Sequence, residues 1–379
     1  MKEKFIVIPD SFKGTMTSAE VCGIMRERIL RFYPRAQVVS IPVADGGEGT
    51  VEAFLAAVGG RRVKQRVSGP FGEAVEAEYG VLPDEETAVL ETASCAGLPL
   101  ASGRLDPLAA TTYGLGELMA GAVRRGCRRL VVGLGGSCTN DAGAGMAAAL
   151  GVTFRDIRGA EFVPTGGTLK NVAAIDCSKA ARFLSGVHIA AMCDIDNPLF
   201  GPEGAARVFS PQKGAGPEAV SELEEGLRHI AGVIQQSLGV DVSGLPGGGA
   251  AGGMGAGMKA FLGAELQPGI EIVLDTVKFG ETLAGAGLVF TGEGRLDAQS
   301  LHGKVVAGVA RRARKAGVPV VAVVGDVGAG AREAYGRGVT AVFSINRTAV
   351  PYEQAKLRSR EDLGSTMEDL LRLLRGVGC

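Results

Sequence analysis

The 379-residue chain lacks several features by which enzymes and binding proteins are often recognised. It has no tryptophan and only 5% aromatic residues, which argues against carbohydrate platforms and base-stacking surfaces. It has three histidines and no G-x-S-x-G sequence, so the pattern of the serine hydrolases is missing. The formal net charge of -1 gives no electrostatic case for binding nucleic acid or an anionic membrane.

Cysteine usage also excludes two classes of protein. The seven cysteines are odd in number and scattered, and no C-x-x-C pair occurs, which argues against a disulfide framework and against a zinc site. We therefore expect a reducing compartment, the cytoplasm. The first apolar stretch is too short for a signal peptide and no run is long enough to span a membrane. The expected partners are small molecules, and a homo-oligomer remains open.

Glycine, in contrast, is abundant, and its 59 copies lie mostly after apolar runs. The clearest example is residues 130–150. An apolar run, Leu130 to Leu134, predicts a buried strand, a glycine turn follows, and Gly143 to Leu150 predicts a small-residue helix. Backbone N–H groups of such a turn, with the partial positive charge of a helix N-terminus, are suited to an anion. The alternative is a tight connection capped by Asn or Asp.

The order of the predicted strands and helices along the chain indicates two α/β domains. Strand and helix patterns alternate at both ends, which favours a Rossmann-like, doubly wound domain built from residues 1–60 and 286–379. Residues 61–285 would form an inserted second α/β domain, with the active site in the cleft between the two. Short strands separated by turns at 61–92 predict antiparallel pairing there. A contiguous two-domain split is the alternative.

Three segments of the inserted domain predict helices or packed loops. Residues 105–126 are expected to be helical, and 217–238 show the clearest helical spacing in the chain. Residues 247–252 formally match G-x-G-x-x-G, but they do not follow a strand, so the match is weak evidence for a dinucleotide site. We expect a tightly packed glycine- and alanine-rich helix there, or a lid over a ligand.

Five predicted strands are each followed by a loop that combines glycine or proline with acids, hydroxyls or bases. These loops are PDSFKGT at 9–15, ADGGEGT at 44–50, GGSCTNDAG at 135–143, DIDNP at 194–198 and TGEGRLD at 291–297. In open α/β sheets, ligands bind at the carboxyl ends of the strands. We therefore expect the five loops to line one cleft.

The content of these loops points to phosphate and a metal ion. Glycine amides suit a phosphate chain, and Mg²⁺ takes one or two carboxylates together with phosphate oxygens. Lys13, Arg295 and Lys304 are candidate cations for the charge of a transferring phosphoryl group. Neither a Walker A sequence nor the protein kinase signature is present. These residues predict a nucleotide- or phosphate-handling enzyme that uses magnesium and lies outside the P-loop class.

Seven motifs, in order, also resemble those of the glycerate kinase family of bacterial glyoxylate and glucarate metabolism. They are PDSFKGT at 9–15, PVADGGEGT at 42–50, GLGGSCTNDAG at 133–143, CDIDNPLFGPEGAA at 193–206, PQKGA at 211–215, GGGAAGGMGAG at 247–257, and TGEGRLDAQS from 291 with Gly303-Lys304. The resemblance implies phosphorylation of D-glycerate by ATP with Mg²⁺, typically giving 2-phosphoglycerate. It also implies a Rossmann-like domain with an inserted domain.

Roles within this reaction are assigned on chemical grounds. A carboxylate near the acceptor hydroxyl would take its proton, with Asp194 the first choice and Asp45 the second. The glycerate carboxylate needs a cation or N–H donors. The predicted sets are Asp194, Lys13 and Asp45 for catalysis; Asp10, Ser11 and Arg295 for substrate binding; Gly135, Gly136, Ser137 and Thr139 for the nucleotide phosphates; and Asp45, Glu48 and Asp297 for magnesium.

Other functions fit the same residues less well. The kinase could give 3-phosphoglycerate or act on a related small hydroxy acid. A nicotinamide-dependent oxidoreductase would need a glycine fingerprint at the first βα turn, where PDSFKGT stands instead. A non-catalytic binding protein would explain a cleft but not the many acids and cations around it.

Overall fold

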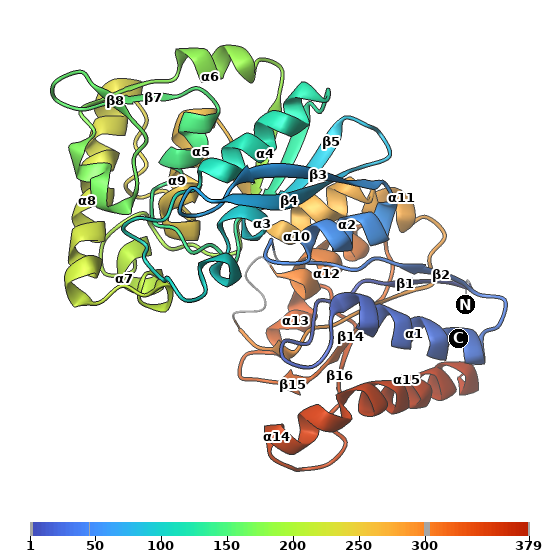
Figure 1. Cartoon of the computed structure of the whole chain (residues 1–379). Helices are drawn as coiled ribbons and strands as arrows, with labels where there is room; N and C mark the ends of the chain where they lie inside the picture. The colour runs from blue at the N-terminus through green and yellow to red at the C-terminus, as the bar shows by residue number, and fades with distance from the viewer. Residues whose placement is uncertain (1–2, 45, 299–303, 378–379) are drawn as a thin grey trace. The chain divides into compact units, whose positions relative to one another are not determined.

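A computed structural model describes residues 3–44, 46–298 and 304–377 (Figure 1). The chain divides into two compact units. The first comprises Met1–Ala44, Glu52–Val58 and Ile270–Cys379, and the second comprises Asp45–Val51 and Gly59–Gly269. Both ends of the chain thus contribute to the first unit. The expected limits at residues 60 and 286 need correction, because the return to the first unit falls at residue 270 and the segment 45–51 belongs to the second unit.

The first unit is built on a parallel sheet with the order β16-β14-β12-β1-β2. Its strands are β1 (Lys4–Val7), β2 (Gln37–Ser40), β12 (Leu288–Thr291), β14 (Val320–Val324) and β16 (Ala341–Ser344). The pairing is parallel throughout, with Phe5 opposite Leu288. Counted in order of appearance, this is the flavodoxin-like doubly wound order, and the chain direction across the sheet reverses between β1 and β12. The doubly wound prediction is confirmed.

Helices cover both faces of this sheet. Helices α1 (Ser18–Phe32) and α15 (Ser359–Gly376) share an apolar cluster with Val321 and Val323 of β14. Helix α12 (Val305–Lys315) packs in another cluster, with the alternate residues Ala322 and Val324. Successive side chains of a strand point to opposite faces, so the two clusters lie on the two sides of the sheet.

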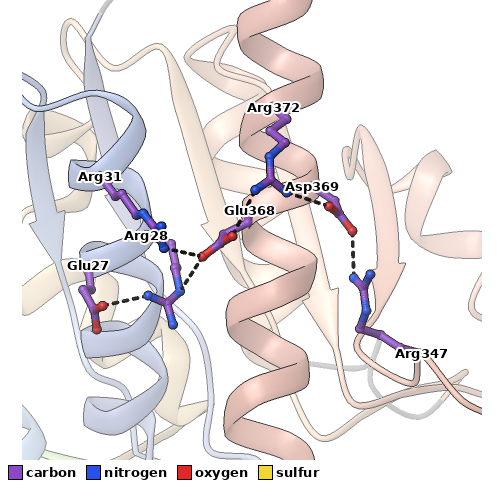
Figure 2. A network of polar contacts seen from close by, with 7 residues as sticks. All are labelled: Glu27, Arg28, Arg31, Arg347, Glu368, Asp369 and Arg372. Carbon is purple, nitrogen blue, oxygen red and sulfur yellow. Dashed lines mark hydrogen bonds and ion pairs between the residues drawn. The ribbon is translucent and has the colours of Figure 1, made fainter.

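An ion-pair network joins α1 to α15 along their exposed sides (Figure 2). Glu368 lies at its centre: its carboxylate is 2.9 Å from a guanidinium nitrogen of Arg31, 3.4 Å from one of Arg28 and 3.3 Å from one of Arg372. Asp369 continues the network to Arg372 and Arg347. The network ties the first helix of the unit to its last.

The second unit contains a six-stranded mixed sheet with the order β11-β10-β6-β5-β4-β3. Its strands are β3 (Arg61–Ser68), β4 (Ala74–Val81), β5 (Thr87–Glu91), β6 (Arg129–Gly133), β10 (His188–Met192) and β11 (Glu265–Gln267). β4 is antiparallel to both β3 and β5, as predicted for 61–92, whereas β5, β6, β10 and β11 are parallel. A small antiparallel sheet holds β7 (Thr153–Arg155), β8 (Glu161–Phe162) and β9 (Ala174–Asp176).

Three helices were predicted in this unit, and two of them are found as expected. Helix α8 (Pro217–Leu238) has the predicted bounds. Helix α4 (Tyr113–Arg124) begins eight residues later than expected, because the Asp106 carboxylate accepts hydrogen bonds from the amides of Leu108 and Ala109 and holds a turn instead. Helix α9 (Ala250–Leu262) is the expected packed glycine- and alanine-rich helix.

The start of α9 packs against the loop that follows β6. Ala251, Gly252 and Gly253 have φ of 52°, 73° and 91°, and a Cβ at Gly252 would lie 2.1 Å from the Thr139 carbonyl oxygen. Only glycine allows so close an approach at position 252. The glycine-rich sequence therefore serves backbone packing in this part of the chain.

The remaining elements are short. They are α2 (Thr50–Val58), α3 (Ala93–Ala96), α5 (Ala144–Ala149), α6 (Ser178–Phe183), α7 (Ala205–Phe209), α10 (Gly269–Thr276), α11 (Phe279–Thr282), β13 (Arg295–Leu296), β15 (Asp326–Val327), α13 (Glu333–Gly336) and α14 (Tyr352–Ala355). Within the described ranges, no helix has both the length and the apolar character needed to cross a membrane.

Candidate active site

In the first unit, two predicted loops meet where the strand order reverses. The Asp10 amide, just after β1, donates a 2.7 Å hydrogen bond to the Gly292 carbonyl oxygen, just after β12. A Cβ at Gly294 would lie 3.4 Å from the Lys13 backbone nitrogen. Such a reversal point is where doubly wound sheets bind their ligands. The structure thus brings together the loops that carry Asp10, Ser11 and Lys13 on one side and Arg295 and Asp297 on the other.

Carboxylates outnumber cations in this loop pair, which carries Asp10, Glu293 and Asp297 but only Lys13 and Arg295. The Arg295 guanidinium lies 3.8 Å from a carboxylate oxygen of Asp297 and 3.8 Å from one of Asp326. The Arg295 side chain is 63% exposed, so solvent screens these ion pairs and they are weak. The Asp10 carboxylate accepts a hydrogen bond from the Ser11 amide at 2.6 Å. The Arg295 guanidinium is therefore accessible to solvent while it takes part in these ion pairs.

In the second unit, three more of the predicted loops lie at the carboxyl edge of the sheet. The Gly135 amide, after β6, donates to the Gly46 carbonyl oxygen at 2.8 Å. A Cβ at Gly46 would lie 2.9 Å from the Met192 Cβ at the end of β10, and Gly46 has a φ of 82°. The loop at 44–50 therefore lies against the ends of β6 and β10, and a glycine is required at its point of contact.

Glu91, which the sequence analysis missed, anchors that loop. It ends β5, is 8% exposed, and accepts a 2.6 Å hydrogen bond from the Val51 amide. Burial raises the pKa of the Glu91 carboxyl, while hydrogen bonds from the amides of Val51 and Gly49 oppose that shift. The sequence signal was present: an acidic residue ends an otherwise apolar strand.

The glycine turn at 135–139 uses some of its donors internally. The Thr139 amide donates to the Ser137 hydroxyl at 3.1 Å, and the two hydroxyls lie 2.7 Å apart. The Gly135 amide is already bonded to Gly46. Among the described residues, the Gly136 and Ser137 amides have no acceptor, and Gly136 is exposed. If this turn binds phosphate, these two amides are the ones in position to do so.

The N-terminus of α5 does not offer an anion site, contrary to the expectation for 130–150. Asp141 is fully buried, and its carboxylate accepts hydrogen bonds from the Thr112 amide and hydroxyl at 2.8 and 2.9 Å and from the Gly143 and Gly145 amides at 3.0 and 3.2 Å. Asp141 thus takes up amides at the start of α5, as in the alternative of a tight connection, although the N-cap residue itself is Gly143. Burial raises the pKa of the Asp141 carboxyl, and these hydrogen bonds oppose the rise.

Two buried polar side chains lie behind the same turn, and the sequence analysis assigned a role to neither. Lys213, at the end of the PQKGA motif's 3₁₀ turn, is 2% exposed, and its ammonium donates to the Thr139 carbonyl oxygen at 2.6 Å. Burial lowers the pKa of Lys213 to about 8. Asn140 is fully buried, and within the described residues neither atom of its amide group has a hydrogen-bond partner.

The remaining predicted residues lie on exposed or half-buried loops. Asp194 is exposed and accepts a 2.8 Å hydrogen bond from the Gly269 amide. Glu48 is exposed, Asp297 is half-buried, and Asp45 lies outside the described residues. Among the residues that the structure describes, no three His, Cys, Asp or Glu side chains are grouped in a way that would hold a metal ion. Glu48 and Asp297 belong to different units.

Sheet edges that carry glycine-rich loops, carboxylates and cations are typical of a small-molecule phosphotransferase outside the P-loop class, and the comparisons with known proteins agree. Residues 5–375 match the glycerate kinase family. A glycerate kinase of Bacillus cereus is 42% identical over 97% of both chains, and the glycerate 2-kinase of Escherichia coli K12 is 45% identical over 90% of both. The chain belongs to the glycerate kinase family.

A solved structure supports the same assignment. The crystal structure of a Salmonella typhimurium LT2 protein described as glycerate kinase 2 superimposes with a TM-score of 0.86. It is 42% identical in sequence, and 99% of each chain is covered. The two-domain α/β fold is therefore shared along nearly the whole length of the chain.

Proposed function

We propose that this chain transfers the terminal phosphoryl group of ATP to the 2-hydroxyl of D-glycerate, giving 2-phosphoglycerate and ADP. The chain is a kinase of the glycerate kinase family, and ATP is the substrate that this class implies. The 2-hydroxyl is favoured by the 45% identity to the Escherichia coli glycerate 2-kinase. The cytoplasm remains our proposed location, on the basis of the odd cysteine count without a C-x-x-C pair.

The loops of the two units would divide the reaction between them. The Gly136 and Ser137 amides of the second unit would hold ATP phosphates, with Gly135 and Thr139 shaping the turn. In the first unit, Lys13, Ser11 and Arg295 would bind the glycerate carboxylate, and Asp10 would orient Ser11 through its amide. The support for this division is that each group of loops lies at the carboxyl edge of its own sheet.

Proton removal from the acceptor hydroxyl is the step assigned to Asp194. One carboxylate oxygen of Asp194 accepts from the Gly269 amide, which helps to fix the side chain, and a carboxylate is a suitable group to take a proton from a hydroxyl. Asp45 is the second candidate for this role. Lys13 would offset the charge that develops on the phosphoryl oxygens.

Magnesium fits the donor chemistry of these loops. Asp45, Glu48 and Asp297 are the proposed carboxylate ligands, and hard oxygen donors are what Mg²⁺ prefers. Because Mg²⁺ is usually held by one or two carboxylates together with substrate phosphates, a cage of three protein ligands is not needed. The bound ion would neutralise charge on the phosphates.

The test is a kinase assay that identifies the product. Purified protein is mixed with ATP, Mg²⁺ and D-glycerate, ADP is followed, and the product is assigned by phosphorus NMR. We expect 2-phosphoglycerate, and no ADP formation above background without glycerate. 3-Phosphoglycerate would keep the kinase and overturn the regiochemistry. ADP formation with tartronate in preference to glycerate would overturn the substrate.

A further inference from the structure

A pocket of about 350 Å³ lies in the second unit, and nothing in the proposed chemistry uses it. Three separate segments line it: the β3–β4 turn, the turn before α4 and the segment after β8. Its prominent side chains are Phe71, Arg104, Thr111, Tyr113, Val163 and Thr165. This volume is in the range of small-molecule sites, and a three-carbon acid would leave most of it unfilled.

The walls of the pocket suit a flat, partly polar group. The Arg104 guanidinium carbon lies 4.1 Å from the centre of the Phe71 ring, so the pocket has an aromatic face with a planar cation over it. Val163 is 45% exposed and adds apolar surface to the wall. Thr111, Tyr113 and Thr165 add hydroxyl groups to the lining, of which those of Thr111 and Thr165 also bond to Asp141 and Thr168.

The pocket is connected to the glycine turn that follows β6. Phe71 packs against a small buried cluster of Ala101, Ala110 and Cys138, and Cys138 belongs to that turn. The Asp141 carboxylate fixes the other wall, because it accepts hydrogen bonds from the amide and hydroxyl of Thr112, beside Thr111. The pocket therefore adjoins the loop assigned to the phosphates.

Strand directions place the pocket at the ligand-binding edge of the sheet. β3 is antiparallel to β4, β4 is antiparallel to β5, and β5 is parallel to β6. β3 therefore runs in the same direction as β6, and the turn that holds Phe71 follows the carboxyl end of β3. Ligands of α/β sheets bind at that edge.

We propose that this pocket binds the nucleoside part of ATP, with the purine stacking on the Phe71 ring in the place that the Arg104 guanidinium occupies in the structure. The inference rests on the proposed phosphate role of the turn at 135–139, from which the nucleotide would extend into the pocket. Stacking of a base on one aromatic ring is sequence-tolerant and contributes substantially to binding. The low aromatic content of the chain does not conflict with this proposal, because a single ring is sufficient to stack one base.

The test compares two ligands that differ only by the nucleoside. Titration calorimetry on the full chain measures the dissociation constants of ATP and of inorganic tripolyphosphate, each with Mg²⁺. For Phe71→Leu, which keeps apolar packing against Cys138 but removes the ring, we expect about tenfold weaker ATP binding and unchanged tripolyphosphate binding. Phe71→Tyr should restore ATP binding.

Phe183→Leu is the matched control. Phe183 is also half-buried, belongs to the same unit and has an arginine, Arg124, over its ring at 5.8 Å, but it does not line the pocket. We expect wild-type affinity for both ligands in this variant. Steady-state kinetics of Phe71→Leu should show a higher KM for ATP and an unchanged KM for D-glycerate.

Other outcomes overturn the inference. Equal weakening of ATP and tripolyphosphate would mean that Phe71 only supports the turn, and a rise confined to the glycerate KM would assign the pocket to the acceptor. If Phe71→Leu is an active kinase with normal ATP affinity, the pocket does not bind the nucleoside, and the proposed function still stands. If ATP binding depends on the ring but glycerate is not phosphorylated, the pocket does bind the nucleoside and the proposed function is wrong. Failure of the wild type to bind ATP would reject both.

Discussion

The ammonium group of Lys213 donates a 2.6 Å hydrogen bond to the Thr139 carbonyl oxygen, and both residues are almost completely buried. A buried cation is costly to desolvate, and this cost is evident in its pKa of about 8. The side chain nevertheless reaches into the turn that precedes Asp141. We interpret Lys213 as a positioning residue that fixes the backbone of this turn at the expense of stability.

The substitution Lys213→Met tests this interpretation through pH. The folded-state pKa of about 8 lies below the ordinary lysine value of 10.5, so the lysine destabilises the fold fully below pH 8 and progressively less as the pH rises to 10.5. The wild type should therefore gain up to about 3 kcal/mol relative to Lys213→Met over this interval. Urea unfolding of both proteins at pH 7 and pH 10 measures the gain; a pH-independent difference would contradict it.

The same variant should lose activity without losing its fold. Replacing a buried charge by an apolar side chain of similar length is often neutral or stabilising. We expect Lys213→Met to be at least as stable as the wild type at pH 7, while kcat/KM for ATP falls about tenfold or more. Exposed Lys259, also in the second unit, supplies the control variant Lys259→Met. Unchanged kinetics in Lys213→Met would reject the positioning role.

Asp194→Asn addresses the proposed proton acceptor. Asparagine keeps an oxygen for the Gly269 amide but cannot accept a proton at neutral pH, so kcat should fall roughly 100-fold to 10,000-fold with little change in KM. Asp196, two residues further along the same exposed loop, gives the control Asp196→Asn, which should retain near-normal turnover. Comparable losses in the two variants would point to a general effect of loop charge.

Asp141 is expected to matter for stability more than for chemistry. Asp141→Ala leaves the donors of Thr112, Gly143 and Gly145 buried without their acceptor, which should cost about 3 kcal/mol or more in unfolding free energy. Asp156→Ala is the control, since its carboxylate also accepts two amide hydrogen bonds but in an exposed turn. Chemical denaturation measures both. Equal, small losses would show that the Asp141 hydrogen bonds contribute little.

Glu368→Ala probes the network between α1 and α15 in Figure 2. The Glu368 side chain is 19% exposed and pairs with three arginines, so its removal should lower stability by about 1 kcal/mol, and less at high salt. Glu27→Ala removes a 69% exposed partner of Arg28 and should change little. Thermal unfolding of both variants is measured at about 50 mM and about 1 M salt, because exposed charges are much more strongly screened at the higher concentration.

The sequence was most informative where local signals agree. Helix α8 begins at a proline and ends before Gly239, whose φ is 71°, so both ends are determined by residues with strong backbone preferences. The parallel strands are short apolar runs followed by polar loops, which is why the loops after β1, β6, β10 and β12 could be predicted. The turn at 105–112 was mistaken for helix because a single side chain, Asp106, overrides the local pattern.

Residues that act across long sequence distances could not be predicted in the same way. Glu91 bonds to Val51 and Lys213 bonds to Thr139, and no local pattern in the sequence specifies either contact. The pocket is even harder to predict from the sequence, because its lining comes from three segments that only the folded sheet brings together. The glycines gave an indirect signal: Gly46 and Gly252 mark places where two backbones nearly touch.

Strand β1 is synthesised long before its neighbour β12, and Phe5 pairs with a strand that begins at Leu288. At about 5–20 residues per second, the ribosome needs on the order of tens of seconds to supply that partner. The second unit, most of which is one continuous stretch, is complete much earlier. Until β12 is made, β1 can pair only with β2, so the side of β1 that receives β12 stays without its partner strand while most of the chain is made.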